Sequence, residues 1–244
     1  MTIAPSPRYT SSKADGSAWR TRMPAVAGIA YVVAWTAGLA AWPVNLALSA
    51  TAEQTAAAYR AHPAEAVVQY LLVEGLAGIL LGIVLAGALR TASKRFGVRV
   101  TGPAVLSAIA VLTSLTQCVL GLLVTAAAAG GRTASCGTLS DLVNRLDGVK
   151  MLALAAAALW IAAGPVLPRW LRVVAVALGL ALVVSGYGYL ALADGLGWTA
   201  YVSGPLLLLW VAGTGVAVTR QRSARERALL PADGADGIPP QGAR

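Results

Sequence analysis

Six long apolar runs limit what this chain can fold into more than any other feature of its sequence. They cover residues 24–48, 65–89, 103–128, 146–164, 171–192 and 200–219. Each is close to the ~20 residues that an α-helix needs to cross ~30 Å of hydrocarbon. Inside lipid, each backbone amide and carbonyl must be paired within its own segment, so we expect these runs to be helices. The predicted fold class is all-α, a polytopic bundle of six transmembrane helices.

Composition supports lipid as the main partner of the chain. Of its 244 residues, 57% are hydrophobic and only 12% are charged, whereas a soluble domain carries about a quarter charged residues. The net charge of +9 raises the question of nucleic-acid binding. That function needs a clustered basic face, but here the charges lie in short segments between apolar runs. We therefore expect a multi-pass protein of the cell (plasma) membrane that binds no nucleic acid.

The positions of the basic residues predict the orientation. With the amino terminus in the cytoplasm, all but four of the 19 Lys and Arg residues fall in cytoplasmic segments or tails. The exceptions are Arg60, Arg132, Arg145 and Lys150. Because cytoplasmic loops of membrane proteins are enriched in Lys and Arg, both termini are expected inside the cell, which also requires an even number of helices.

The chain divides into one membrane domain and two tails. Residues 1–22 and 221–244 are polar or Pro/Gly-rich and basic, and we expect both to be disordered, flanking a domain over residues 23–220. A signal peptide is the rival interpretation of the first run. We favour a retained helix, because that run is longer than the 7–15 apolar residues, roughly, of a signal peptide.

Glu74 is the most informative residue of the sequence. It lies about nine residues into the second run from the outer side, roughly 13 Å deep at ~1.5 Å per residue. A charged side chain at the centre of a bilayer costs ~2.5–3.5 kcal/mol or more, and such residues are functional candidates by default. We expect Glu74 to face the bundle interior as a buried, neutral acid, with Gln69 and Tyr70 one turn outward on a similar face.

The fourth helix, if it begins at Asp141 ahead of the apolar run, carries a second polar group. Asp141, Asn144, Asp147 and Lys150 recur every three residues and form a slowly turning stripe on a helix. Asp147 and Lys150 are spaced for an ion pair. Two alternatives stay open: Glu74 pairs with Lys150 only to lock two helices together, or the stripe is the polar mouth of a helix that begins at the surface.

Other polar and aromatic side chains at similar depth are candidates for binding a substrate: Trp42, Asn45, Gln117, Tyr187, Tyr189 and Tyr201. The single histidine, His62, stands in an outer loop, and no HExxH, DDxxD, CxxC, GxSxG or Walker motif occurs. We therefore expect neither a metal site nor a cofactor. Gly78 and Gly82 form a GxxxG pattern, a close-packing face through which the chain could form a homo-oligomer.

Two resemblances follow from these residues. The chain resembles small six-helix membrane proteins of actinobacteria whose function is unknown. The shared features are a helix that ends near Trp-Pro, a Tyr-Arg-x-His-Pro loop and a helix with an internal Glu. The matching stretch is Ala57–Gly78, and Asp141–Lys150 adds to it. More weakly, the chain resembles integral-membrane terpene cyclases of the meroterpenoid and indole-terpenoid type. That resemblance implies that Glu74 and Asp147 are catalytic carboxyls. The cyclases look seven-helical, however, and six helices are predicted here.

These features lead to three functional hypotheses. The first is a metal-independent terpene cyclase in which buried Glu74 protonates a lipophilic prenylated substrate. Such a cyclisation is an isomerisation and would serve biosynthesis. The second is a small proton-coupled permease or resistance protein that uses Glu74 with Lys150 or Asp147. The third is a membrane subunit with no small-molecule site.

Overall fold

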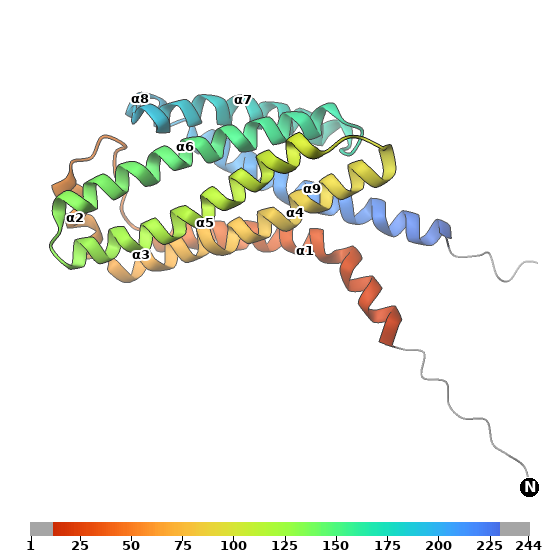
Figure 1. The fold of residues 1–244 in the computed structure, drawn as a ribbon, viewed down its shortest axis with the longest axis horizontal. Helices are drawn as coiled ribbons and strands as arrows, with labels where there is room; N and C mark the ends of the chain where they lie inside the picture. Colours follow the sequence, from red (N-terminus) through yellow and green to blue (C-terminus); the bar gives the residue numbers. More distant parts are fainter. Residues whose placement is uncertain (1–11, 230–244) are drawn as a thin grey trace, which may run out of the picture.

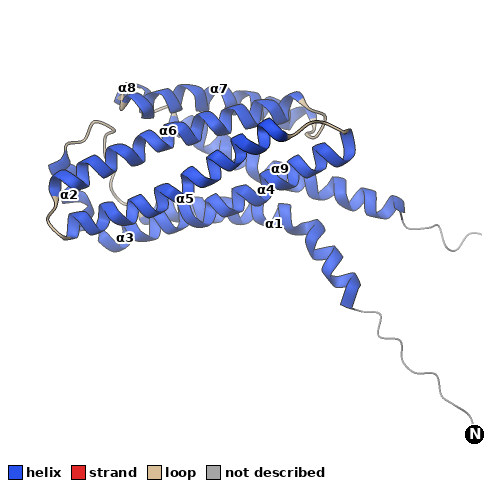
Figure 2. Ribbon diagram, in the orientation of Figure 1, coloured by secondary structure: helices blue, strands red, loops and turns tan. Residues whose placement is uncertain are grey.

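A computed structural model describes residues 12–229; residues 1–11 and 230–244, the outer parts of the two expected tails, lie outside the described residues. Within this range the chain forms helices and no strand (Figure 2). Six helical segments are long and apolar enough to cross a membrane: Thr21–Ala41, Pro63–Lys94, Thr101–Ala129, Thr133–Ala163, Arg169–Ala191 and Asp194–Ala228. The predicted all-α membrane bundle of six helices is confirmed.

Four long helices each provide most of one apolar segment: α1 (Ser12–Ala41), α5 (Thr101–Ala129), α6 (Thr133–Ala163) and α7 (Arg169–Ala191). The second segment is composite and joins α3 (Pro63–Gln69), the π-helix η1 (Tyr70–Leu76) and α4 (Ala77–Phe96). The last joins the short α8 (Asp194–Gly197) to α9 (Ala200–Leu229). The short α2 (Ala52–Ala61) precedes α3.

The bundle has two distinct ends. Figure 1 shows α2 and α8 at one end, here called the loop end, and the free ends of α1 and α9 at the other, here called the tail end. The strongest helix contacts are those of α6 with α5 and α7, followed by those of α1 with α9. Both ends of the described chain thus emerge on the same side, as an even number of crossings requires.

Helix continues further toward both termini than the predicted domain boundaries at residues 22 and 221. α1 already begins at Ser12, and α9 ends at Leu229. The two helices hold one another at the tail end: the backbone amide of Ala25 donates to Thr219 Oγ1 at 3.1 Å. A Cβ atom at Gly215 would lie 2.3 Å from the carbonyl oxygen of Pro24, so the two backbones approach closely there. The inner parts of the expected tails also contact one another, since the Thr21 hydroxyl donates to Glu226 Oε1 at 2.5 Å.

The core also divides between the two ends. Toward the tail end lies a close-packed cluster of buried apolar side chains. Its fully buried members include Val84, Leu85, Leu171, Leu178 and Trp210. A second, smaller cluster lies at the loop end, where α2 and η1 meet α5 and α6. The polar residues discussed below lie between these two apolar clusters.

The GxxxG face of the second segment packs inside the chain. A Cβ atom at Gly78 would lie 2.9 Å from Ser114 Oγ, and one at Gly82 would lie 3.2 Å from Val111 Cγ2, both on α5. The two glycines therefore allow α4 to approach α5. The surface that we expected to contact a second copy is occupied by the chain's own helix.

Candidate functional site

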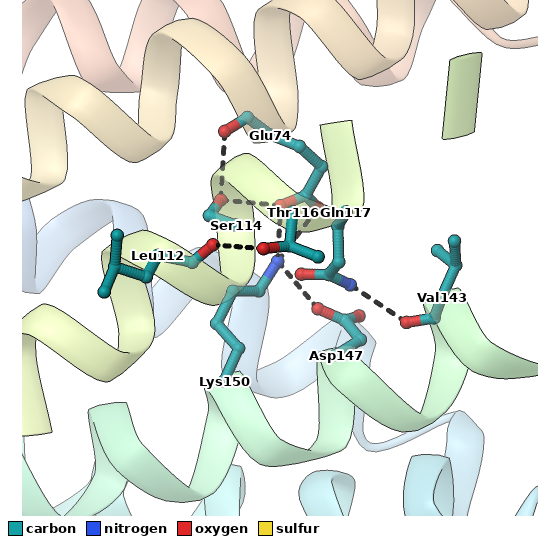
Figure 3. Close-up of polar contacts among 8 residues, drawn as sticks. All are labelled: Glu74, Leu112, Ser114, Thr116, Gln117, Val143, Asp147 and Lys150. Carbon is teal, nitrogen blue, oxygen red and sulfur yellow. Dashed lines mark hydrogen bonds and ion pairs between the residues drawn. The ribbon is translucent and has the colours of Figure 1, made fainter. Parts of the chain in front are cut away.

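A lysine joins two carboxylates in the interior of the bundle (Figure 3). Lys150 Nζ on α6 lies 2.9 Å from Glu74 Oε1 and 2.7 Å from Glu74 Oε2 on η1. The same nitrogen lies 2.7 Å from Asp147 Oδ1, one turn earlier on α6. The side chains of Lys150, Glu74 and Asp147 are only 14%, 11% and 21% exposed. We call this group the charged triad.

A third helix contributes to the triad through Ser114 of α5. Its hydroxyl oxygen lies 2.7 Å from Glu74 Oε2 and 3.1 Å from the backbone carbonyl oxygen of Glu74. The Glu74 carboxylate thus accepts from two different helices. The sequence led us to expect a buried acid at this position, and the structure places that acid against a lysine and a serine. Charge-assisted hydrogen bonds of this kind are about twice as strong as neutral ones.

Glu74 lies in a π-helical turn, and an aromatic cluster holds the start of that turn. Tyr70 is buried, and its hydroxyl lies 2.6 Å from that of Tyr59 on α2. The rings of Tyr59 and Trp42 are 5.0 Å apart. Tyr70 lies directly over Gly121 of α5, where a Cβ atom would come within 2.3 Å of its ring. π-helical turns are rare and often occur at functional sites.

Tyr59 keeps its proton in this cluster. It lies on α2, outside the apolar segments, and burial raises the pKa of its phenol above the ordinary value. The hydrogen bond between the hydroxyls of Tyr59 and Tyr70 therefore persists over the neutral pH range. The cluster acts as an anchor that fixes where η1 begins.

The charged triad forms part of the wall of a cavity of about 830 Å³. That volume lies within the range of about 300–1,000 Å³ that is typical of small-molecule sites. The remaining wall is mainly apolar and aromatic, with Tyr31 and Trp35 from α1 and Leu182 from α7 among its members. The cavity therefore combines one ionic side with walls suited to a lipophilic molecule.

Two tyrosines flank the triad inside this cavity. Tyr31 on α1 and Tyr189 on α7 are each close enough to interact electrostatically with Lys150, Glu74 and Asp147. Both line the cavity. Because aromatic rings stabilise cations, a cation bound beside the triad would lie near these two aromatic side chains as well as two carboxylates.

An extended segment, residues 42–50, borders the cavity at the loop end, and we call it the 42–50 strap. Asp194 at the start of α8 accepts hydrogen bonds from the backbone amides of Leu48, at 2.6 Å, and Ser49, at 3.3 Å. Its carboxylate also accepts from the Ser49 hydroxyl. Asn45 Nδ2 in the strap donates to the hydroxyl of Tyr201 on α9 at 3.3 Å. Side chains of the strap and of α8 both line the cavity.

The structure brings most of the predicted site residues together. Seven of them line the cavity: Asn45, Gln69, Glu74, Asp147, Lys150, Tyr189 and Tyr201. The predicted ion pairs of Lys150 with Asp147 and with Glu74 are both present.

Five predicted residues lie elsewhere. Trp42 and Tyr70 belong to the aromatic cluster, and Asn144 is half-buried on α6 outside the cavity wall. Gln117 is buried beside the triad, where its Nε2 donates to the Val143 carbonyl oxygen at 3.0 Å. Tyr187 is 64% exposed and faces away from the bundle. It lies two positions from Tyr189, and residues two apart on a helix lie on different faces.

Sequence reasoning missed four contributors to the site: Tyr31, Trp35, Ser114 and Asp194. Tyr31 and Trp35 are spaced by one helical turn, which could have indicated a shared face. Ser114 and Gln117 show the same spacing, on a helix that has no charged residue. Asp194 carried no recognisable signal, since its partners are backbone amides of a distant loop.

Within residues 12–229, no three His, Cys, Asp or Glu side chains gather into a group that could hold a metal ion. Cys118 and Cys136 are buried free thiols. The arrangement can bind a molecule with a polar or cationic part and can hold or release a proton at a carboxylate. Comparison with protein-family models, with curated proteins and with solved structures finds no match for the chain.

Proposed function

We propose that the chain is a membrane-embedded, metal-independent terpene cyclase that starts the reaction of a lipophilic prenylated substrate by protonation from the charged triad. The observation that carries this proposal is the placing of two carboxylates around a single ammonium on the wall of an apolar cavity of about 830 Å³.

The triad is one proton short of neutrality when all three groups are ionised. Glu74 and Asp147 then carry two negative charges against the one positive charge of Lys150. An uncompensated charge in surroundings of low polarity is costly. One added proton on a carboxyl oxygen makes the triad neutral, so this group is suited to carrying a single exchangeable proton beside the cavity.

Asp147 is the better of the two carboxyls to hold that proton. Glu74 accepts from Lys150 at both oxygens and from Ser114 at one of them, which favours its ionised form. Asp147 accepts from Lys150 through Oδ1. The geometry therefore supports Asp147 as the general acid and Glu74 as the carboxylate that holds Lys150, a reversal of the roles expected from the sequence.

The reaction balances without any other reactant. The carboxyl O–H of Asp147 breaks as its proton forms a new C–H bond with an alkene carbon, whose C=C π bond is consumed, or an O–H bond with an epoxide oxygen, whose C–O bond breaks. A second alkene of the substrate attacks the resulting carbocation and closes a ring. Loss of a proton from the carbon next to the final cation forms a C=C bond and returns the proton to the carboxylate. The rings of Tyr31, Trp35 and Tyr189 would stabilise the cation by cation–π contact.

Turnover in deuterated water tests this proposal directly. Purified protein in lipid nanodiscs would be incubated with prenylated phenols, prenylated indoles and their terminal epoxides. In ordinary water the expected product has the mass of the substrate and a different retention time. In deuterated water, protonation of an alkene should add one carbon-bound deuterium, which makes the product one mass unit heavier. Asp147→Asn should abolish turnover. Asp141→Asn, which removes an exposed acid of the same helix, is the matched control and should retain it.

Full activity of the Asp147→Asn and Glu74→Gln variants would contradict the proposal. So would product formation that requires an added metal ion or redox cofactor.

A proton-coupled permease for lipophilic cations is the second candidate, because a cation could replace the exchangeable proton of the triad. The packed cluster around Val84, Leu85 and Trp210 lies toward the tail end of the bundle and favours a blind pocket. Proteoliposomes with an imposed pH gradient separate the candidates: accumulation of a lipophilic cation that is lost in Glu74→Gln would favour transport. If Glu74→Ala changes stability alone, the chain is a membrane subunit without a small-molecule site.

A further inference from the structure

Gln117 on α5 carries a buried amide that is only half satisfied. The residue is 1% exposed. Its Nε2 donates to the carbonyl oxygen of Val143 at 3.0 Å, whereas its Oε1 is buried without a hydrogen-bond partner among the described residues. An unsatisfied buried acceptor costs about 1–3 kcal/mol. The described residues provide no hydrogen-bond donor to this oxygen.

The hydrogen bond of Nε2 determines the orientation of the Gln117 amide. Exchanging the oxygen and nitrogen of Gln117 would place Oε1 against the Val143 carbonyl oxygen, and two acceptors would then face each other. The hydrogen-bond network thus assigns the orientation. In an α-helix the carbonyl of Val143 is directed at the backbone amide of Asp147, one turn later, so Gln117 reaches the turn of α6 that carries Asp147. Figure 3 draws Gln117 together with Asp147 and Lys150 and marks the contact of its amide with the Val143 carbonyl oxygen.

The donors already present near Gln117 are in use. Lys150 places its ammonium against both oxygens of Glu74 and against Asp147 Oδ1, which accounts for its three N–H groups. Ser114 has a single O–H, and its hydroxyl lies against Glu74. An ionised carboxylate donates nothing. A further donor arises when a carboxyl of the triad takes up a proton.

We propose that Gln117 is the positioning residue of the exchangeable proton, whose Oε1 accepts the hydrogen bond from the O–H group of protonated Asp147. Gln117 does not line the cavity, so it acts through Asp147 and not on a substrate. It holds the proton on the side of Asp147 that faces α5 until the substrate is bound. The inference rests on the proposed function only in that the triad carries one exchangeable proton.

Several titratable groups face Asp147 and share its proton equilibrium. Lys150 lies on its own helix. Glu74 and Tyr70 approach from η1, Tyr31 from α1 and Tyr189 from α7. α5 contributes the polar side chains of Ser114 and Gln117 and carries no charged residue. Removing the Gln117 oxygen therefore changes the hydrogen bonding at Asp147 and leaves the surrounding charges in place.

Infrared difference spectroscopy of the whole protein in nanodiscs tests the inference without any substrate. Spectra collected across a pH titration should contain, besides the bands of the exposed carboxyls, one C=O stretching band that is absent from the Asp147→Asn variant. Gln117→Met keeps the volume and lacks the acceptor. In this variant the band should move to higher frequency, because the O–H loses its partner, and its titration midpoint should move to lower pH.

Two variants complete the design. Thr116→Val is the matched control, since Thr116 directly precedes Gln117 on α5 and its hydroxyl donates to the Leu112 carbonyl oxygen of the same helix. In this variant the carboxyl band should be unchanged. Gln117→Asn keeps an amide and withdraws it by one methylene, so a smaller change in the same direction is expected. This variant also serves if Gln117→Met does not fold.

The outcomes separate this inference from the proposed function. An unchanged band in folded Gln117→Met or Gln117→Asn overturns the role of Gln117 and leaves the cyclase proposal standing. A band that disappears in Glu74→Gln and persists in Asp147→Asn overturns the inference by placing the proton on Glu74. If neither Asp147→Asn nor Glu74→Gln removes a titrating carboxyl band, the triad has no exchangeable proton and both proposals fail.

Discussion

Lys150 on α6 and Glu74 on η1, 76 positions apart in the chain, form an ion pair in which Nζ lies 2.7 Å from Oε2. The pair ties the π-helical turn to α6, and Asp147 makes the lysine a bridge between two carboxylates. A buried group of this kind is weak evidence for stability, because desolvation opposes the Coulomb attraction. It is better evidence for a function that needs charged groups in the interior of the bundle. Each substitution in this group should therefore have an effect that depends on the charge it leaves behind.

Removal of the lysine alone should destabilise the bundle strongly. Lys150→Met leaves two carboxylates facing one another in the interior, and breaking a buried pair typically costs about 3–5 kcal/mol. Unfolding in mixed micelles would measure the loss. A triple variant with Lys150→Met, Glu74→Gln and Asp147→Asn should regain most of it, since no uncompensated charge remains. A triple variant as unstable as Lys150→Met would show that packing, and not charge, explains the effect.

The glycine beneath Tyr70 should be intolerant of any side chain. Gly121→Ala places a methyl group 2.3 Å from the Tyr70 ring, so the ring must shift and its hydrogen bond to Tyr59 is lost. Overpacking of this kind costs about 1–3 kcal/mol. Gly102→Ala on the same helix meets no atom within 4 Å and should range from neutral to about 1 kcal/mol more stable. Equal unfolding midpoints for the two variants would contradict the close contact at Gly121.

Asp194 should control the mobility of the 42–50 strap. Asp194→Ala removes the acceptor of the Leu48 and Ser49 amides. Hydrogen exchange at these two amides should become faster, while exchange in α5 and α6 stays the same. Ser49→Ala removes only the side-chain part of this contact and should have a smaller effect. Uniformly faster exchange throughout the bundle would instead indicate that Asp194→Ala has lowered global stability.

Cysteine labelling in intact cells should report the predicted orientation. Arg132 at the loop end and Arg99 between α4 and α5 are both exposed, whereas the native Cys118 and Cys136 are buried and free. With the loop end outside the cell, a membrane-impermeant maleimide should label Arg132→Cys in intact cells and Arg99→Cys only after lysis. The reverse pattern would place both termini outside.

The positions of the charges along the chain allowed much of the site to be predicted. Glu74, Asp147 and Lys150 stand out because charged residues are rare within apolar runs, and the spacing of Asp147 and Lys150 already indicates an ion pair. The contribution of Ser114 was not predictable in the same way, since serines are common in membrane helices and hydroxyls can bond to their own backbone. Tyr187 and Tyr189 look equivalent in the sequence, and only the rotation of α7 directs Tyr189 inward and Tyr187 outward.

The sequence by itself determined the number of apolar segments, their helical state and the presence of ionisable groups within them. These follow from the length of the apolar runs and from the need to pair backbone groups in lipid. Tertiary structure decided which groups meet. The π-helical turn, with Tyr70 over Gly121, carries Glu74 to Lys150 and Ser114. The packing of α5 on α6 leaves the Gln117 oxygen without a hydrogen-bond partner among the described residues. Such contacts depend on helix rotation and close approach, which hydrophobic patterns along a single chain do not specify.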